Sequence, residues 1–357
     1  MEKQWEKELT EYIIQGEPNQ KERSLIWKTA IGLQDVDKLS TSEYLLKTAK
    51  EHIEGKISID SVQTRINSYY ETRTERIDLE NDTEEADKVS ARIAKILGEK
   101  AFQFSPTELL SIHKRLFEGI FCHAGKIRDC NISKKEWILN GETVTYSSYN
   151  NIMATLEYDF TTEKAFSYKN LTKDSVLKHI VEFASNLWQI HPFMEGNTRT
   201  TAIFIIKYLN TLGFQVGNEV FANNSWYFRN ALVRANYNDL SKGIYATKQY
   251  LILFFENLML GKKNELKNRY LHIEYESAIV NEKNVGVNVG VNVGVNITDM
   301  EQEVLAVIRE NNTITATIIA NQCQVSTRTV ERTIKSLKEK NILERVGSDK
   351  TGHWIVK

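Results

Sequence analysis

A short loop carries most of the side chains in this sequence that could do chemistry. Between His191 and Thr200 the chain places an imidazole, a carboxylate, an amide and a guanidinium, which belong to His191, Glu195, Asn197 and Arg199. Residues on both sides repeat apolar positions at steps of three and four, which predicts two helices that face a core. A connection between two buried helices gains no stability from so many polar groups, so we expect a reactive site here.

Each of these groups suits one part of a reaction at a phosphate. His191 can act as a general base near neutral pH, and the proline after it would hold it extended. Glu195 offers the hard oxygen ligand that Mg²⁺ prefers. Gly196 and Asn197 begin the second helix, whose free N–H groups and dipole attract phosphates, and Arg199 adds a positive charge.

The order of these residues resembles the signature of the Fic family, H-P-F-x-[D/E]-G-N-[G/K]-R-x-x-R, which lies on a loop between two core helices. The similarity covers the active loop, and family-like features extend over roughly half of the chain. By that resemblance His191 would deprotonate a hydroxyl of the target, Phe193 would anchor the loop, and Glu195 would hold Mg²⁺. The phosphates of the co-substrate ATP would be bound by Gly196, Asn197, Thr198 and Arg199.

The resemblance implies a nucleotidyltransferase, namely a protein adenylyltransferase that moves AMP from Mg-ATP to a Ser, Thr or Tyr hydroxyl of a target protein or of itself. Thr198 replaces a Gly or Lys of the signature, and Ala202 replaces its second Arg, so the nucleotide donor is open. One alternative is a DNA-binding regulator whose Fic-like core only senses nucleotide. Others are an enzyme that uses another donor, such as UTP or a phosphocholine carrier, and an enzyme that removes AMP.

A β-hairpin is predicted over residues 136–146, where Asn140 and Gly141 form a two-residue turn between β-prone residues. This hairpin resembles the flap of the family, which would bind a target segment as an added strand. The resemblance makes Ile138, Leu139, Asn140 and Gly141 the target-binding residues.

An inhibitory residue is suggested by Glu54, which precedes Gly55. The pair resembles the end of the family's inhibitory motif, [S/T]-x-x-x-E-[G/N], although Lys50 stands at the Ser or Thr position. The resemblance implies that an N-terminal helical unit restrains activity by placing Glu54 at the phosphate site near Arg199. A solvent-facing Glu before a helix-ending Gly is an equally good interpretation.

The last sixty or so residues predict three helices and then two strands, an order that resembles a winged helix-turn-helix. Eight Lys or Arg stand against four Asp or Glu from Cys323 to Lys357. We therefore expect DNA phosphates as the partner, with Thr327, Arg328 and Arg332 of the third helix at the major groove. Winged helices also dock proteins, which is the alternative.

The overall composition limits the class of protein to which these elements can belong. The chain has 357 residues, 46 Lys plus Arg against 47 Asp plus Glu, and 41% hydrophobic residues; these values exclude a disordered chain and a wholly basic nucleic-acid binder. Only 3 Pro and 17 Gly predict a mainly α protein. Three cysteines without a CxxC pair, no signal peptide and no long apolar run predict a cytoplasmic protein with no membrane partner.

Four parts are predicted along the chain. Residues 1–80 form a helical antitoxin-like regulatory unit, and residues 81–262 form a Fic-like catalytic domain with its flap. Residues 263–296 are a linker that contains three Val-Gly-Val-Asn repeats. Residues 297–357 form the winged-helix domain. The target protein and the oligomeric state, including a homodimer, are open.

Overall fold

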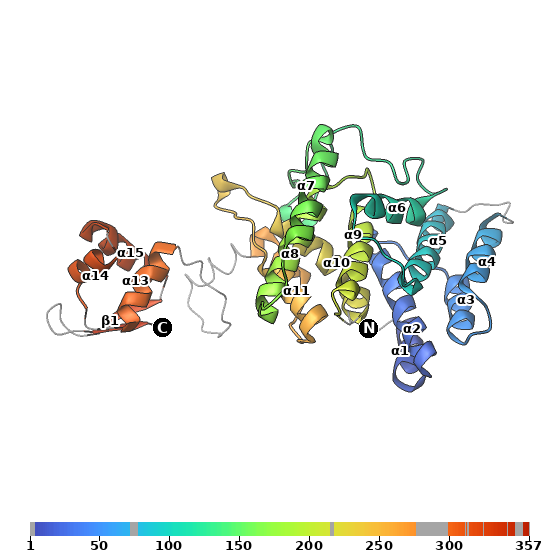
Figure 1. Ribbon diagram of the computed structural model, residues 1–357, viewed down its shortest axis with the longest axis horizontal. Helices are drawn as coiled ribbons and strands as arrows, with labels where there is room; N and C mark the ends of the chain where they lie inside the picture. The colour runs from blue at the N-terminus through green and yellow to red at the C-terminus, as the bar shows by residue number, and fades with distance from the viewer. Residues whose placement is uncertain are drawn as a thin grey trace. The chain divides into compact units, whose positions relative to one another are not determined.

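The chain folds into two compact units, Met1–Val285 and Gly286–Lys357. The computed structural model describes residues 4–71, 78–214, 218–275, 299–310, 312, 314–323, 325–340, 342–346 and 353–356. Helices dominate both units (Figure 1), which confirms the predicted mainly α class. None of the helices in these ranges combines the length and the apolar character that a membrane span requires.

The first unit is built from helices joined by loops and 3₁₀ turns. In chain order they are α1 (Gln4–Gln15), α2 (Pro18–Gly32), η1 (Leu33–Asp37), α3 (Glu43–Ile53), α4 (Ile59–Glu71), α5 (Asp78–Gly98), α6 (Pro106–Phe117), η2 (Trp137–Leu139), η3 (Tyr149–Asn151), α7 (Ile152–Ala165), α8 (Lys173–Ile190), α9 (Asn197–Thr211), α10 (Asn218–Ala235), η4 (Leu240–Lys242), α11 (Gln249–Leu260) and η5 (Asn268–Leu271). Hydroxyl caps start several of them: Ser105 accepts from the N–H of Glu108 at α6, and Thr172 accepts from the N–H of Ser175 at α8.

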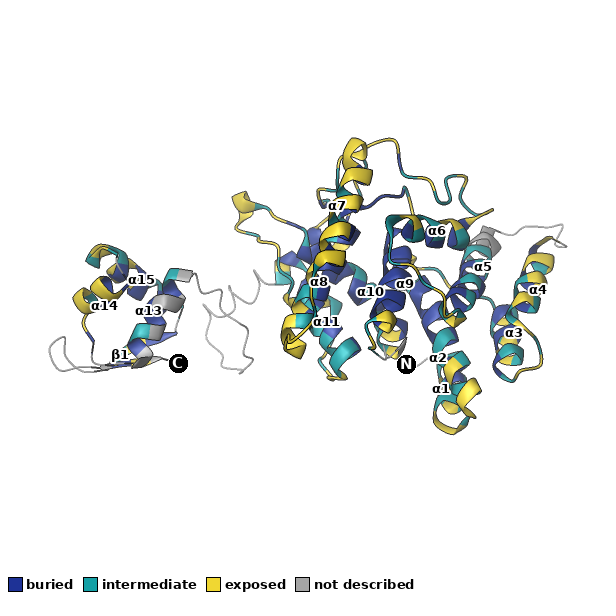
Figure 2. Cartoon of the chain, viewed as in Figure 1, coloured by how far each residue is buried: buried dark blue, intermediate teal, exposed yellow. Residues whose placement is uncertain are grey.

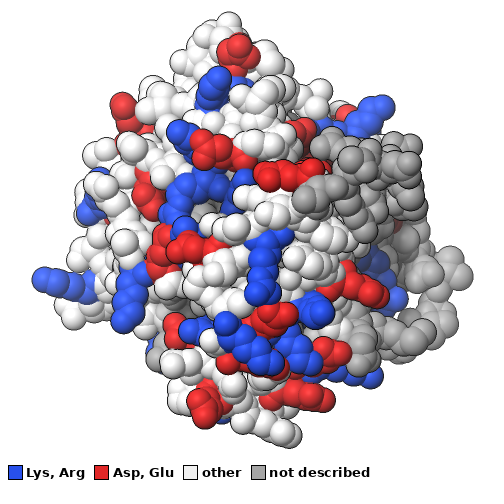
Figure 3. Space-filling model, turned by 90° about the vertical axis from the view of Figure 1, so that its right-hand side faces the viewer, with Lys and Arg blue, Asp and Glu red and all other residues white. Residues whose placement is uncertain are grey.

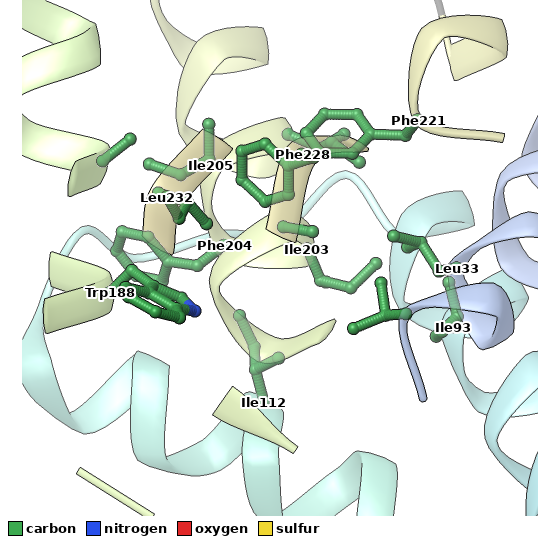
Figure 4. Close-up of a cluster of buried hydrophobic side chains, with 14 of the residues drawn as sticks. Leu33, Ile93, Ile112, Trp188, Ile203, Phe204, Ile205, Phe221, Phe228 and Leu232 are labelled. Carbon is green, nitrogen blue, oxygen red and sulfur yellow. The ribbon is translucent and has the colours of Figure 1, made fainter. Parts of the chain in front are cut away.

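Helix α9 lies at the centre of this unit. Every residue from Asn197 to Leu209 is buried, and the helix packs against α5, α6, α8 and η1. Figure 4 shows Ile203, Phe204 and Ile205 of α9 pointing in different directions among side chains of other helices. Burial is concentrated on α8, α9 and α10, whereas α4 and α7 expose broad faces (Figure 2). A helix enclosed on all sides must find partners for its polar residues inside the protein.

The N-terminal helices share one hydrophobic core with the rest of the first unit. Trp27 and Leu45 belong to the same buried cluster as Phe204 and Phe228. Helix α2 approaches α10 so closely that a Cβ on Gly32 would lie 2.2 Å from the carbonyl oxygen of Ala222. The compact unit therefore joins the predicted regulatory unit 1–80 to the predicted catalytic domain.

The predicted linker begins later than we expected. Leu271, which ends the η5 turn, and Ile273, which follows it, are apolar and are buried in the core of the first unit. Residues 263–275 thus belong to that unit, and the Val-Gly-Val-Asn repeats lie outside the described residues.

The flap segment differs from the predicted hairpin. The two-residue turn is present, with φ of 55° at Asn140 and 86° at Gly141, but the residues before it form the η2 turn. Backbone bonds close the loop: the N–H of Glu136 donates to the carbonyl oxygen of Glu142 (2.9 Å), and the N–H of Gly141 donates to the carbonyl oxygen of Glu136 (2.9 Å). Ile138 and Leu139 are both fully buried. A strand would send these neighbours to opposite faces, so burial of both favours the 3₁₀ turn.

The second unit has its own small core. It contains α13 (Asp299–Glu310), α14 (Ala316–Gln322), α15 (Thr327–Glu339), β1 (Leu343–Val346) and β2 (His353–Val356), and the two strands pair antiparallel with Leu343 opposite Val356. Val330 and Leu337 of α15 pack with Trp354 of β2. The predicted order of three helices and two strands is confirmed, and its identification as a winged helix stays a prediction.

Candidate active site

The active loop begins at an unusual backbone conformation. His191 caps the C-terminus of α8 with φ 49° and ψ 61°, and its N–H donates to the carbonyl oxygen of Trp188 (3.1 Å). The prediction that Pro192 holds His191 extended is therefore wrong. A left-handed residue at this position reverses the chain directly after α8, and a non-glycine residue there requires support from its surroundings.

Arg128 provides that support. It is buried, and its guanidinium donates to the carbonyl oxygens of His191 (2.8 Å), Cys130 (2.6 Å) and Ser147. Its own N–H donates to the carbonyl oxygen of Pro192 (2.9 Å). The sequence analysis missed Arg128, because a single arginine in a polar stretch carries no signal of which carbonyls it will meet.

His113 of α6 holds the middle of the loop. Its Nε2–H donates to the carbonyl oxygen of Glu195 (3.0 Å), and its Nδ1 accepts from the N–H of Gly125 (2.8 Å). The imidazole stacks on the buried ring of Phe193, with centroids 3.7 Å apart. The expected anchor, Phe193, thus packs on a histidine to which the sequence analysis gave no role. The only available signal was its place on the apolar face of a predicted helix.

The imidazole of His191 is enclosed by aromatic rings. It is 3% exposed, lies 4.0 Å from the ring of Tyr146, and meets the edge of Trp188. Its Nδ1 is 3.3 Å from the carbonyl oxygen of Trp188. Burial lowers the pKa of His191 well below its ordinary value, and the positive charge of Lys134 lowers it further. The imidazole is therefore neutral near pH 7 and can accept a proton.

The start of α9 is organised by its own side chains. Asn197 donates from Nδ2 to the carbonyl oxygen of Phe193 (2.7 Å) and accepts at Oδ1 from the N–H of the same residue (3.0 Å). Thr198 accepts from the indole N–H of Trp188 (2.9 Å), so its hydroxyl points into the core. Gly196 has φ 75°, and a Cβ there would lie 2.4 Å from the ring of Phe117. Because the side chains of Asn197 and Thr198 are engaged inside the protein, the groups that remain to bind a phosphate are the backbone amides of this turn.

Arg199 is not free in this structure. Its Nε lies 2.8 Å from Asp37, its Nη2 lies 2.6 Å from Glu85, and its Nη1 donates to Gln34 (3.0 Å). The guanidinium also lies over the ring of Phe117. We call Asp37 and Glu85 the acidic clamp. A phosphate that binds Arg199 must compete with both carboxylates.

The inhibitory candidate Glu54 lies elsewhere. Its carboxylate accepts from the hydroxyl of Tyr12 (2.5 Å) and pairs with Lys56 (2.6 Å). No contact between Glu54 and Arg199 occurs within the described part of the chain. The acids that reach Arg199 come from η1 and α5, and this pairing across many residues has no local sequence signal.

Glu195 is the one side chain of the active loop that suits a metal. It is exposed and pairs with Lys134 (2.6 Å). Among the described residues, no group of three or more His, Cys, Asp and Glu is placed to hold a metal ion. A single accessible carboxylate fits Mg²⁺ that arrives with a nucleotide, because this ion keeps several waters and needs few protein ligands. Lys134 would have to give up its partner.

The flap exposes different side chains from those expected. Ile138 and Leu139 are 0% exposed, whereas Trp137 is 51% exposed. The side chains of Ile138 and Leu139 fix the flap to the core, and the role of this segment in binding a target strand stays a prediction. Asn140 donates to Glu274 (2.6 Å), and Gly141 stands beside it in the turn. Trp137 is the side chain that a target could contact.

In the second unit, α15 presents two of the three predicted DNA contacts to solvent. Arg328 and Arg332 are exposed and stand one turn apart, and Thr327 is partly exposed. Ser326 caps the helix by accepting from the N–H of Thr329 (3.1 Å). The opposite face, which contains Val330 and Leu337, is buried.

The loop should weaken in acid through His113. Burial lowers the pKa of His113 to about 4, and its hydrogen bond to Glu195 opposes that shift. Because the unfolded chain binds this proton near pH 6.5 and the folded chain does not, stability is complete above about pH 6.5 and is lost as the pH falls toward 4. Between these values His113 should reduce the free energy of unfolding by up to about 1.4 kcal/mol per pH unit.

Urea unfolding at several pH values, followed by tryptophan fluorescence, measures this slope. A His113→Gln variant should show a slope that is smaller by about one bound proton. Equal slopes for the parent and His113→Gln would contradict the assignment.

Comparison with known proteins finds Fic proteins among the solved structures that resemble this chain. No curated protein matches the chain. A Fic family protein from Desulfovibrio desulfuricans G20 is 13% identical with a TM-score of 0.45, over 99% of this chain and 92% of that chain. The N-terminal Fic domain of a Bartonella effector protein from Bartonella sp. AR 15-3 is 21% identical with a TM-score of 0.41, over 50% of this chain and 81% of that chain. The N-terminal FIC domain of Bep8 from Bartonella sp. 1-1C is 19% identical with a TM-score of 0.41, over 53% and 88%.

The family is indicated most directly by a segment of the sequence. Residues 103–209 match the model of the Fic/DOC family. This segment runs from just before α6 into α9 and contains the flap, the loop from His191 to Arg199, and both residues that position it, His113 and Arg128. This segment of the chain is therefore similar to the Fic/DOC family.

Proposed function

We propose that this protein is an adenylyltransferase that moves AMP from ATP to a hydroxyl group of a target protein or of itself. One observation carries the proposal: a neutral, buried imidazole, that of His191, stands in the same short loop as the first amides of a buried helix. This pairs a proton acceptor with a phosphate-binding helix end. Fic-type domains are generally transferases of nucleotide-derived groups, which supports the same class.

The reaction would exchange the α,β-phosphoanhydride bond of ATP for a phosphoester bond to the target. The hydroxyl oxygen of the target attacks the α-phosphorus of ATP and forms a new O–P bond, while the bond to the bridging oxygen breaks and pyrophosphate leaves. His191 takes the hydroxyl proton. Its Nδ1 faces the carbonyl oxygen of Trp188, so that nitrogen carries the hydrogen and Nε2 is the acceptor.

The remaining groups of the loop would orient the nucleotide. Backbone N–H groups at the start of α9 would bind phosphate oxygens, because the hydrogen bonds of Asn197 and Thr198 hold this turn rigid. Glu195 would hold Mg²⁺, which neutralises negative charge on the phosphates. Trp137 of the flap would contact the target chain.

The acidic clamp would restrain this activity. Asp37 and Glu85 neutralise Arg199 in the folded protein, so a nucleotide gains less from that arginine than it would from a free one. Asp37 of η1 and Glu85 of α5 would thus perform the inhibitory role that the resemblance assigned to Glu54.

Incubation with ATP, GTP, CTP or UTP, each labelled at the α-phosphate, tests the proposal. We expect label from ATP on protein, and a loss of about a hundredfold or more in the His191→Ala variant, because a general base contributes that much. A His179→Ala variant, outside the loop, controls for loss of a histidine. Label retained by His191→Ala would remove His191 from its role. Nucleotide binding without transfer would favour a sensor, and label from UTP would favour another donor.

Release of the acidic clamp should speed labelling. An Asp37→Asn variant keeps the volume of the side chain but removes one charge from Arg199, and we expect about fivefold faster labelling, as for a loss of about 1 kcal/mol of ion pairing. The matched Glu54→Gln variant should label at the parent rate. Faster labelling by Glu54→Gln alone would return the inhibitory role to Glu54. Thermal melting of both variants checks that each is folded.

A second candidate function is DNA binding by the C-terminal unit. The exposed pair Arg328 and Arg332, one turn apart on α15, favours it, because such a pair can reach phosphates or guanine edges along one groove. Electrophoretic shift of duplex DNA at low salt should be weakened by Arg328→Gln and by Arg332→Gln. An unchanged shift in both variants, or no shift by the parent, would reject this role and leave protein docking.

A further inference from the structure

A second concave site lies away from the active loop. A cavity of about 280 Å³ is lined by residues of α4, α5, α6 and the turn after α6: Gln63, Ile66, Asn67, Lys88, Ala91, Arg92, Lys95, Ile96, Arg115 and Glu118. None of them comes from the loop between His191 and Arg199. Four of these residues are cationic and one is anionic, so their formal charges sum to +3 (four minus one).

Helix α5 supplies three of the four cations from one face. Lys88, Arg92 and Lys95 stand four and three residues apart, and like charges at this spacing repel one another. Figure 3 looks onto the side of the molecule where α3, α4 and α5 lie, and it shows Lys and Arg side chains close together there, with Asp and Glu beside them. Such an arrangement costs stability unless an anion offsets it.

Arg92 carries the clearest sign of an incomplete site. Its Nη1 donates to the carbonyl oxygen of Leu116 (2.9 Å), and the described residues place no carboxylate within ion-pair distance of it. Burial lowers the pKa of Arg92, and Glu118 opposes that shift only from a distance. A half-buried guanidinium without a carboxylate is a fork of N–H donors that matches a phosphate.

The other three cations have partners that a ligand could replace. Lys95 pairs with Asp60 (2.8 Å), Lys88 pairs with Glu84 (2.6 Å), and Arg115 pairs with Glu99 (2.7 Å). The Asp60 side chain is 73% exposed, and exposed pairs of this kind contribute little. Lys95 can therefore turn toward an anion at small cost, whereas Lys88 and Arg115 would each exchange a closer carboxylate partner for the anion.

We propose that this cavity binds the phosphate monoester of a small polar molecule. Arg92 would hold the phosphate, with Lys88, Lys95 and Arg115 around it. The amides of Gln63 and Asn67 would bond to hydroxyl groups of the remainder. The volume suits a sugar phosphate better than a bare ion, and it is just below the usual range for ligand pockets.

The position of the cavity gives it a means to act on the active loop. Glu85 of the acidic clamp and Lys88, Arg92 and Lys95 of the cavity belong to the same helix, α5. A ligand that draws Lys88 away from Glu84 acts on the turn of α5 that holds Arg199. The binding site itself does not depend on the proposed reaction.

Calorimetric titration of the full chain with ribose 5-phosphate, and with ribose as the uncharged control, tests the proposal. We expect binding of the phosphate ester alone, weaker at higher salt, and a loss of about tenfold or more in Arg92→Gln, since hydrogen bonds to charged groups contribute that much. The separate variant Lys95→Gln, whose side chain is more exposed, should also weaken binding.

The matched variant Lys178→Gln, an exposed lysine on α8, should bind as the parent does. Binding that survives both Arg92→Gln and Lys95→Gln would place the ligand elsewhere, for instance at the active loop, and would overturn the proposal. So would equal binding of ribose, or no binding by the parent at low salt. Melting temperatures separate loss of binding from loss of folding, and if Arg92→Gln fails to fold, the Lys95→Gln result decides.

Discussion

The enclosure of α9 is the constraint on which the first unit depends. A helix buried from Asn197 to Leu209 that contains Arg199 and Lys207 must give each charge a partner inside the protein, since a buried unpaired charge costs several kcal/mol. Lys207 donates to the carbonyl oxygens of Ile96 and Glu99 at the end of α5. Arg199 takes Asp37, Glu85 and Gln34. The contacts of Arg199 join η1 and α5 to the start of α9, in addition to the shared hydrophobic core.

Arg199 couples the loop to η1 and α5. The same arginine that stands at the start of α9, where a phosphate would bind, is also the arginine that holds η1 and α5 in place. On the other side, Arg128 and His113 hold the loop through carbonyl oxygens. The loop is therefore positioned mostly by contacts to its backbone.

At the flap and at Glu54, tertiary packing gave a result that the local sequence pattern did not predict. Alternating residues around Asn140 and Gly141 predict a hairpin, and the turn itself is present. The isolated pair of strands had no sheet to join, and burying Ile138 beside Leu139 gained more than a short ladder would. Glu54 was matched to a motif by its neighbours alone, yet its carboxylate meets Tyr12 and Lys56.

By itself the sequence determined the helical class, the polar loop between two core helices, and the order of elements in the C-terminal unit. These follow from periodicity and from side-chain types over a few residues, which act locally. Only the tertiary structure decided that Asp37 and Glu85 meet Arg199, that His113 and Arg128 support the loop, and that α4, α5 and α6 enclose a cationic cavity. Those contacts join residues far apart in the chain, and their geometry depends on how all the helices pack together.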